Sequence, residues 1–99
     1  MFAMVAYDVP AKRTEVFRKL LSQYLTHEQN SVFMGRLSEA AYRTMMADLS
    51  KVAREDEGLL SILAENQNNV RVSKLRKDGD NGRLEVVPAN VHERGFDII

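Results

Sequence analysis

Asp8 is the residue of this sequence whose position most favours chemistry. It ends an apolar run at residues 2–7 and precedes Val9 and Pro10. Functional side chains commonly lie where the chain leaves a rigid scaffold for a loop, although an aspartate before such a step is also typical of a simple turn. A single carboxylate is a poor site for Mg²⁺ or Mn²⁺, which prefer several oxygen ligands. A two-fold dimer that brings two Asp8 side chains together would double the carboxylate count.

Basic residues form two groups that are candidates for binding phosphate. Lys12 and Arg13 stand at the expected start of a helix, where positive charge opposes the macrodipole but where free N–H groups favour an anion. Neutralisation by neighbouring acids and an ordinary solvated surface are the alternative interpretations. The residues that we expect to contact nucleic acid are Arg13, Arg18, Arg76 and Lys77.

Other reactive side chains offer less. Tyr7 and Phe33 could stack on bases, but aromatic residues on strands are also typical core residues. Ser31 has no evident acid–base partner nearby, which argues against nucleophilic catalysis. His27 and His92 lack the spacing of metal ligands, and the absence of cysteine excludes disulfides and thiolate zinc sites.

Length and composition indicate the size and class of the protein that carries these side chains. A chain of 99 residues makes one domain with a small core, which dimerisation would stabilise. The 14 basic and 14 acidic residues balance, which argues against a generic nucleic-acid coat but not against a local basic face. The N-terminus lacks a basic leader and no apolar stretch approaches the ~20 residues of a membrane span. We therefore expect a cytoplasmic protein with no membrane contact.

Two helices and an extended segment are predicted in the first half of the chain. Apolar residues recur at helical spacing over residues 14–25 and predict an amphipathic helix. Residues 28–37 read as one bent strand or a hairpin, with Gly35 permitting a bulge. Ser38 is a suitable N-cap for a second helix, which ends at the acidic run of residues 55–57.

Three short strands are predicted after the second helix. Residues 59–65 and 70–75 flank a turn at residues 66–69, and residues 84–87 form a strand that stops at Pro88. The order of elements predicts an α+β fold, a ferredoxin-like βαββαβ sandwich with an antiparallel sheet and two helices on one face. We expect C-terminal strands at the edge of that sheet. The domain would span residues 1–77, and residues 78–99 would supply a turn, a short strand and a tail for dimer or partner contacts.

Two motifs resemble those of a known family. The sequence Tyr7-Asp8-Val9 at the end of the first strand is similar to the family's opening tyrosine–aspartate motif. Residues 29–37 are similar to its second signature, Gln-x-Ser-Val-Phe-x-Gly-x-Leu, and one amphipathic helix separates the two. The chain thus resembles CRISPR-associated protein two, the small subunit of spacer acquisition, from Met1 to about Leu75.

This resemblance implies a ferredoxin-like homodimer in which Asp8 of each chain binds Mg²⁺ or Mn²⁺ as the catalytic ligand near the two-fold axis. It implies metal-dependent endonuclease activity on RNA or DNA, and assembly with CRISPR-associated protein one, the integrase, around prespacer DNA. Arg13 would contact phosphate. The residues lining the dimer cleft would be Tyr7, Ser31 and Phe33.

Three residues depart from the family pattern. His27 stands where a basic residue is usual, Glu28 where an apolar one is usual, and Glu15 where some members carry arginine. We expect Glu28 to make its strand more exposed, and Glu15 to weaken the nuclease interpretation. Two alternatives stay open: a stand-alone, toxin-like endoribonuclease of the same fold, and a non-catalytic ferredoxin-like regulatory module.

Overall fold

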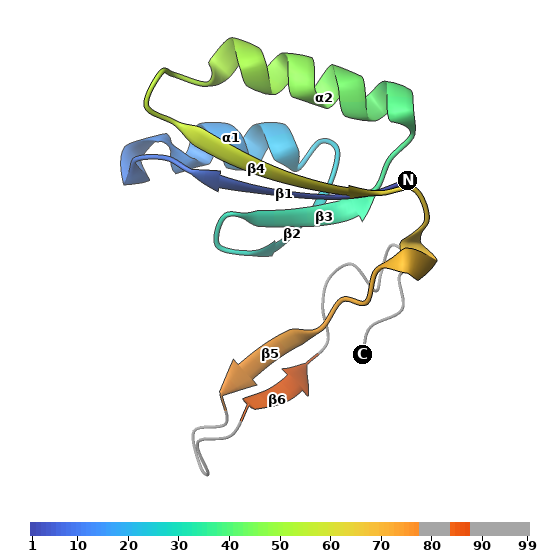
Figure 1. Cartoon of the computed structure of the whole chain (residues 1–99). Helices are drawn as coiled ribbons and strands as arrows, with labels where there is room; N and C mark the ends of the chain where they lie inside the picture. Colours follow the sequence, from blue (N-terminus) through green and yellow to red (C-terminus); the bar gives the residue numbers. More distant parts are fainter. Residues whose placement is uncertain (78–83, 88–99) are drawn as a thin grey trace.

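The computed structural model describes residues 1–77 and 84–87 and has the predicted α+β architecture. Four strands form one sheet in the order β2-β3-β1-β4, and every neighbouring pair is antiparallel. Helices α1 and α2 lie side by side on one face of the sheet (Figure 1). This is the ferredoxin-like arrangement. The elements of the sandwich are β1 (Phe2–Asp8), α1 (Thr14–Leu21), β2 (Thr26–Gln29), β3 (Val32–Arg36), α2 (Glu39–Val52) and β4 (Gly58–Ala64).

The core lies between the sheet and the two helices. Alternate residues of β1 point into it, and Ala3, Val5 and Tyr7 are all buried there. Phe17 and Leu21 of α1 are fully buried in the same cluster. Every second side chain of β1 and the side chains on one face of α1 therefore pack together in one apolar layer.

The first helix is shorter than predicted. It ends at Leu21, and the amides of Tyr24 and Leu25 then both donate to the Leu21 carbonyl as the chain turns towards β2. The Tyr24 hydroxyl donates to Asp48 of α2 at 2.6 Å, and Leu25 is 1% exposed. The periodicity of the sequence predicted that Tyr24 and Leu25 are helical, but in the structure they make these tertiary contacts after the helix has ended. The second helix begins as predicted, since the Ser38 side chain accepts a hydrogen bond from the Ala41 amide.

The segment at residues 28–37 resolves into the hairpin β2–β3, with a positive φ of 41° at Asn30 in the turn. The irregularity in its register falls between His27 and Gln29 and not at Gly35. Gly35 instead allows a close approach, because a Cβ there would lie 3.2 Å from the Leu25 side chain. The bulge places Glu28 opposite no residue of β3, so the expectation that Glu28 exposes its strand is wrong: its side chain is 2% exposed.

The predicted C-terminal strands do not extend the four-stranded sheet. Residues 66–69 contain a short 3₁₀ turn, and among the described strands β5 (Lys74–Lys77) pairs with β6 (Leu84–Val87), in a separate two-stranded sheet. This hairpin extends away from the sandwich on the side opposite the helices (Figure 1). The predicted turn at residues 78–82, Pro88 and the tail lie outside the described residues.

A strap of residues 70–74 joins β4 to the hairpin and crosses the sheet face opposite the helices. Val72 packs on Phe2 in a second small apolar cluster. The Lys74 ammonium donates to the Glu28 carbonyl at 2.9 Å and lies 3.6 Å from its carboxylate. The strap is thus fastened at the bulge of β2, which explains how a buried glutamate is tolerated.

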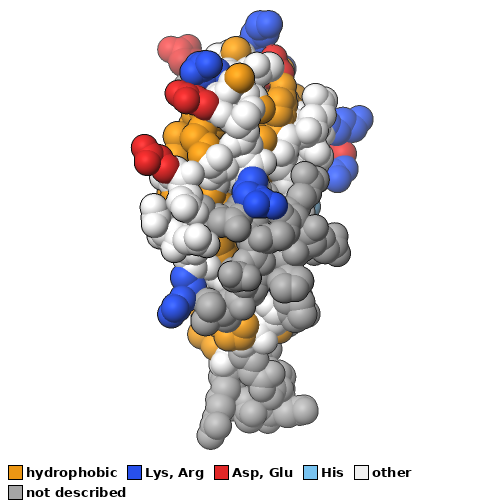
Figure 2. Space-filling view, turned by 90° about the vertical axis from the view of Figure 1, so that its right-hand side faces the viewer, with side chains coloured by type: hydrophobic (Ala, Val, Ile, Leu, Met, Phe, Trp, Pro, Cys, Tyr) orange, Lys and Arg blue, Asp and Glu red, His pale blue; other side chains and the backbone are white. Residues whose placement is uncertain are grey.

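The rest of that face, which we call the open face, is apolar. Its members on β1, β3 and β4 are cross-strand neighbours: Met4, Ala6, Met34, Leu60 and Ile62. Leu60 and Ile62 are 59% and 48% exposed, and exposed apolar side chains also mark the hairpin at Leu75, Leu84 and Val86. Figure 2 shows hydrophobic side chains reaching the surface over both the upper and the lower parts of the molecule. No helix within residues 1–77 is long and apolar enough to cross a membrane.

Candidate active site and nucleic-acid interface

Asp8 is exposed at the last position of the central strand β1, opposite Gly58 at the start of β4. Among residues 1–77 and 84–87, no hydrogen bond or ion pair occupies its carboxylate. A shallow hollow of about 370 Å³ lies beside it, lined by Ala6, Tyr7, Gly58, Leu59 and Leu60. The sheet therefore fixes the backbone of Asp8 and leaves its carboxylate available to a ligand.

Tyr7 lies between this hollow and a second one on the helix side. The second hollow, of about 400 Å³, is lined by Tyr7, Thr14, Glu15, Arg18, Asn30 and Ser31. Burial raises the pKa of the Tyr7 hydroxyl, while the nearby Arg18 charge opposes that shift in part. The hydroxyl is consequently protonated at neutral pH and can donate a hydrogen bond.

The three predicted cleft residues divide between surface and core. Ser31 lines the second hollow, and its carbonyl accepts from the Tyr7 amide at 3.2 Å. Phe33 is fully buried, with its ring centroid 6.3 Å from that of Tyr7 and 4.6 Å from that of His27. In one copy of the chain Phe33 is therefore a core residue, and its part in a dimer cleft stays a prediction.

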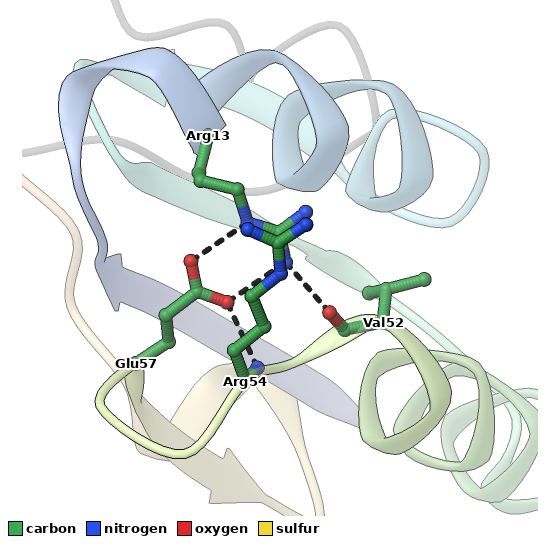
Figure 3. A network of polar contacts seen from close by, with 4 residues as sticks. All are labelled: Arg13, Val52, Arg54 and Glu57. Carbon is green, nitrogen blue, oxygen red and sulfur yellow. Dashed lines mark hydrogen bonds and ion pairs between the residues drawn. The ribbon is translucent and has the colours of Figure 1, made fainter.

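Arg13 is held by the protein itself (Figure 3). Its Nε and Nη2 donate to the two carboxylate oxygens of Glu57 at 2.9 and 2.8 Å, and Nη2 also donates to the Val52 carbonyl at 2.7 Å. The side chains of Arg13 and Glu57 are 12% and 3% exposed. The hydrogen bonds from Arg13, helped by the Arg54 amide, lower the pKa of Glu57 to about 2. This geometry commits Nε and Nη2 of Arg13 to Glu57 and Val52, and its charge to a buried carboxylate, so the phosphate contact of Arg13 stays a prediction.

Arg18 is engaged in a different way. Its guanidinium donates to both oxygens of Glu15, one turn earlier on α1, and this pairing lowers the pKa of Glu15. The two side chains are 48% and 55% exposed. Such an exposed pair within one helix contributes little to stability. Arg18 is therefore available for exchange with another anion, whereas Arg13 is not.

Arg76 and Lys77 lie on β5, outside the four-stranded sheet. The fold thus does not bring them next to Asp8 on the central strand, and any nucleic acid that contacts both would have to span from the sandwich to the hairpin. Their role in phosphate binding stays a prediction.

The donor set for a divalent metal is incomplete in one copy of the chain. The described residues contain no cluster of three Asp, Glu or His side chains that could hold a metal. Asp8 alone offers a hard anionic oxygen at an open position. The residues fit a divalent ion only if a second copy supplies a second Asp8, as the sequence had indicated.

Sequence reasoning missed Glu57 and underestimated Glu15. Glu57 was assigned to an acidic run that ends a helix, yet it is the buried partner of Arg13. The sequence contained one indication of this role: Glu57 directly precedes the apolar strand β4, and a residue at the start of such a strand lies next to the core. Glu15 was noted only as a departure from a pattern, but it lies in the second hollow as the partner of Arg18.

Comparison with known proteins agrees with this fold. The family described as CRISPR associated protein Cas2 matches residues 1–78. The chain is 47% identical over 49 residues to the CRISPR-associated endoribonuclease Cas2 of Haloferax volcanii, covering 50% of this chain and 57% of that protein. It is 36% identical over 76 residues to the protein of the same name from Pyrococcus furiosus, covering 77% and 78%.

Solved structures agree as well. The crystal structure of a Cas2 superposes with a TM-score of 0.60 at 39% identity, covering 63% of this chain and 71% of that one. The structure of Streptococcus pyogenes Cas2 also gives a TM-score of 0.60, at 26% identity, covering 70% and 93%. With the tyrosine–aspartate end of β1 and the second signature on β2–β3, these matches leave one conclusion: the chain belongs to the Cas2 family of CRISPR-associated proteins.

Proposed function

We propose that this chain is a CRISPR adaptation protein: the dimeric centre of a spacer-integration complex, with endonuclease activity on RNA or DNA. The observation that carries the proposal is the exposed Asp8 carboxylate at the end of the central strand, in a member of this family. The Haloferax and Pyrococcus relatives are named endoribonucleases, which supports hydrolysis of a phosphodiester. The first match spans little more than half of that relative, so the activity is proposed here.

The homodimer follows from what one chain lacks. A site with a single carboxylate needs a second, and the open face exposes Leu60 and Ile62 to water. A two-stranded hairpin such as β5–β6 is only marginally stable alone. A second copy that covers the open face and contacts the hairpin and strand edges would supply the second carboxylate, bury the exposed apolar side chains and stabilise the hairpin.

In this dimer the two Asp8 side chains would hold Mg²⁺ or Mn²⁺. The ion would supply an activated water and neutralise charge on the phosphodiester. Arg18 and the Tyr7 hydroxyl, which line the neighbouring hollow, would bind phosphate oxygens. We assign integrase binding to residues 78–99, the segment that the sequence predicts to supply dimer or partner contacts.

A spacer-integration assay tests this function. The purified chain is combined with a CRISPR-associated protein one integrase, a prespacer duplex and a plasmid that carries the repeat array, and insertion is measured with and without the chain. We expect insertion only when both proteins are present, and RNA or DNA cleavage by the chain alone in Mn²⁺ or Mg²⁺. Cleavage of RNA without any effect on insertion would favour the stand-alone endoribonuclease instead.

A further inference from the structure

The second hollow already contains an anion, the Glu15 carboxylate. The same hollow is also lined by Arg18, Tyr7 and Ser31. Glu15 accepts hydrogen bonds from Nε and Nη2 of Arg18, which is the two-point geometry that arginine also uses for phosphate. The hydrogen bonds from Arg18 lower the pKa of Glu15, which is therefore a carboxylate at neutral pH, as an ordinary glutamate is.

The same chain offers a comparison that shows why this anion is replaceable. The Arg13–Glu57 pair is 12% and 3% exposed, and three hydrogen bonds fix the guanidinium. Separating it would leave a buried charge without a partner, which is costly. The Arg18–Glu15 pair is 48% and 55% exposed, so water solvates both charges as they separate. An incoming anion can therefore displace Glu15 at little cost.

We propose that Glu15 is an internal competitor for nucleic-acid phosphate: it occupies the donors of Arg18 in the free protein and is displaced when a phosphodiester enters the hollow. Glu15 then sets the affinity and limits non-specific binding, because every phosphate that uses Arg18 must first break this pair. The inference rests on the proposed function in that the incoming anion is a nucleic-acid backbone. It goes beyond that function by assigning a regulatory role to a residue that binds no ligand.

The test compares two glutamates that each pair with an arginine on a helix. Glu15→Gln removes the competitor, while Glu39→Gln removes the same charge from the exposed Glu39–Arg43 pair of α2, where the nitrogen and oxygen are 3.3 Å apart. Binding of a fluorescein-labelled single-stranded RNA and of a labelled DNA duplex is measured at one fixed salt concentration. Melting temperatures confirm that both variants are folded.

We expect Glu15→Gln to tighten binding by about two- to fivefold relative to Glu39→Gln, the range that an exposed ion pair is worth. The gain should vanish in an Arg18→Gln background, because the competitor acts through Arg18. Equal affinities for Glu15→Gln and Glu39→Gln would overturn the inference, as would a gain that persists without Arg18 or weaker binding by Glu15→Gln.

The two nucleic acids show which backbone uses the hollow: an effect with RNA alone, DNA alone or both supports the competitor role for that ligand. Failure of the underlying function looks different. If neither RNA nor DNA binds the wild-type protein or any variant at low salt, the proposed function is wrong and the competitor role falls with it.

Discussion

The guanidinium of Arg13 is held by the carboxylate of Glu57, the residue directly before Gly58, which pairs with Asp8 across the sheet. Arg13 itself follows Asp8 on the connection from β1 to α1. The pair therefore ties the chain that leaves Asp8 to the strand that lies opposite Asp8. Arg13 also donates a hydrogen bond to the Val52 carbonyl at the end of α2. The β1–α1 connection, the end of α2 and the start of β4 are therefore joined at this one arginine (Figure 3).

We predict that this pair is the most sensitive polar contact of the sandwich. Arg13→Met should lower the free energy of unfolding several times more than Arg43→Met, because the first leaves a buried carboxylate alone and the second breaks a solvated pair. Urea unfolding of both variants measures the difference. Equal losses would mean that Arg13 and Glu57 are exposed in solution.

The same pair predicts a pH dependence of stability. The pKa of Glu57 falls from its ordinary 4.5 to about 2 on folding, so its contribution is complete above about pH 4.5 and is lost as the pH falls towards 2. Glu57→Gln should be less stable than wild type at pH 7, and this difference should shrink on acidification to pH 3. Urea unfolding of both proteins at the two pH values is the measurement. A difference that stays constant with pH would show that Glu57 has an ordinary pKa.

Adjacent residues of β4 allow a test of the dimer. Ile62 lies on the open face and Leu63 on the helix face, and they are 48% and 45% exposed. Ile62→Lys should weaken dimerisation by about tenfold or more, because it places a charge in an apolar contact, while Leu63→Lys should change it little. Sedimentation velocity at micromolar concentration separates the two. A folded wild-type monomer at that concentration would contradict the homodimer.

Arg13 and Arg18 should differ in nucleic-acid binding. Arg18→Gln should flatten the dependence of log K on log salt by about 0.9 for duplex DNA, the loss of one phosphate contact. Arg13→Gln should leave that slope unchanged in the folded protein, since the Arg13 charge is already paired with the buried carboxylate of Glu57. A flatter slope for Arg13→Gln and an unchanged slope for Arg18→Gln would show that Arg13, and not Arg18, contacts phosphate.

The sandwich could be predicted from the sequence because its signals are local. The apolar run of β1, the helical spacing of Phe17 and Leu21, and the Ser38 cap each depend on nearby residues, and all three elements are confirmed. The placement of β5 could not be predicted in this way. Strand propensity indicates that residues are extended but not which strand they pair with. Here Lys74 binds Glu28 at the bulge of β2, and β5 pairs with β6 and not with the four described strands of the sandwich.

The candidate site was predicted unevenly for a related reason. Asp8 was identified because a strand end is visible in sequence. The role of Arg13 was not, since its partner Glu57 is 44 residues away and only the fold brings them together. Arg13 and Arg18 look alike in the sequence, but in the fold Arg13 is buried against a buried carboxylate, whereas Arg18 and its carboxylate are both exposed.

The last prediction separates chemistry from assembly through Asp8. Asp8→Asn removes the exposed carboxylate while nearly preserving its shape, and Asp56→Asn removes another exposed carboxylate from the loop before β4 as a control. Cleavage in Mn²⁺ or Mg²⁺ should fall by about a hundredfold or more in Asp8→Asn only, the scale of losing an activating group. Dimerisation should persist or tighten slightly, because two like charges no longer face each other across the axis.

Integration distinguishes the two roles that remain for Asp8. Integrase binding is assigned to the C-terminal segment, so the Asp8→Asn dimer should still support insertion of a prespacer duplex. Lost cleavage with retained insertion would make Asp8 a catalytic residue that the assembly does not need, and loss of both would place it in the assembly as well. Full cleavage by a rigorously purified Asp8→Asn protein would contradict the metal site, and would leave Asp8 as the residue that begins the turn into Val9 and Pro10.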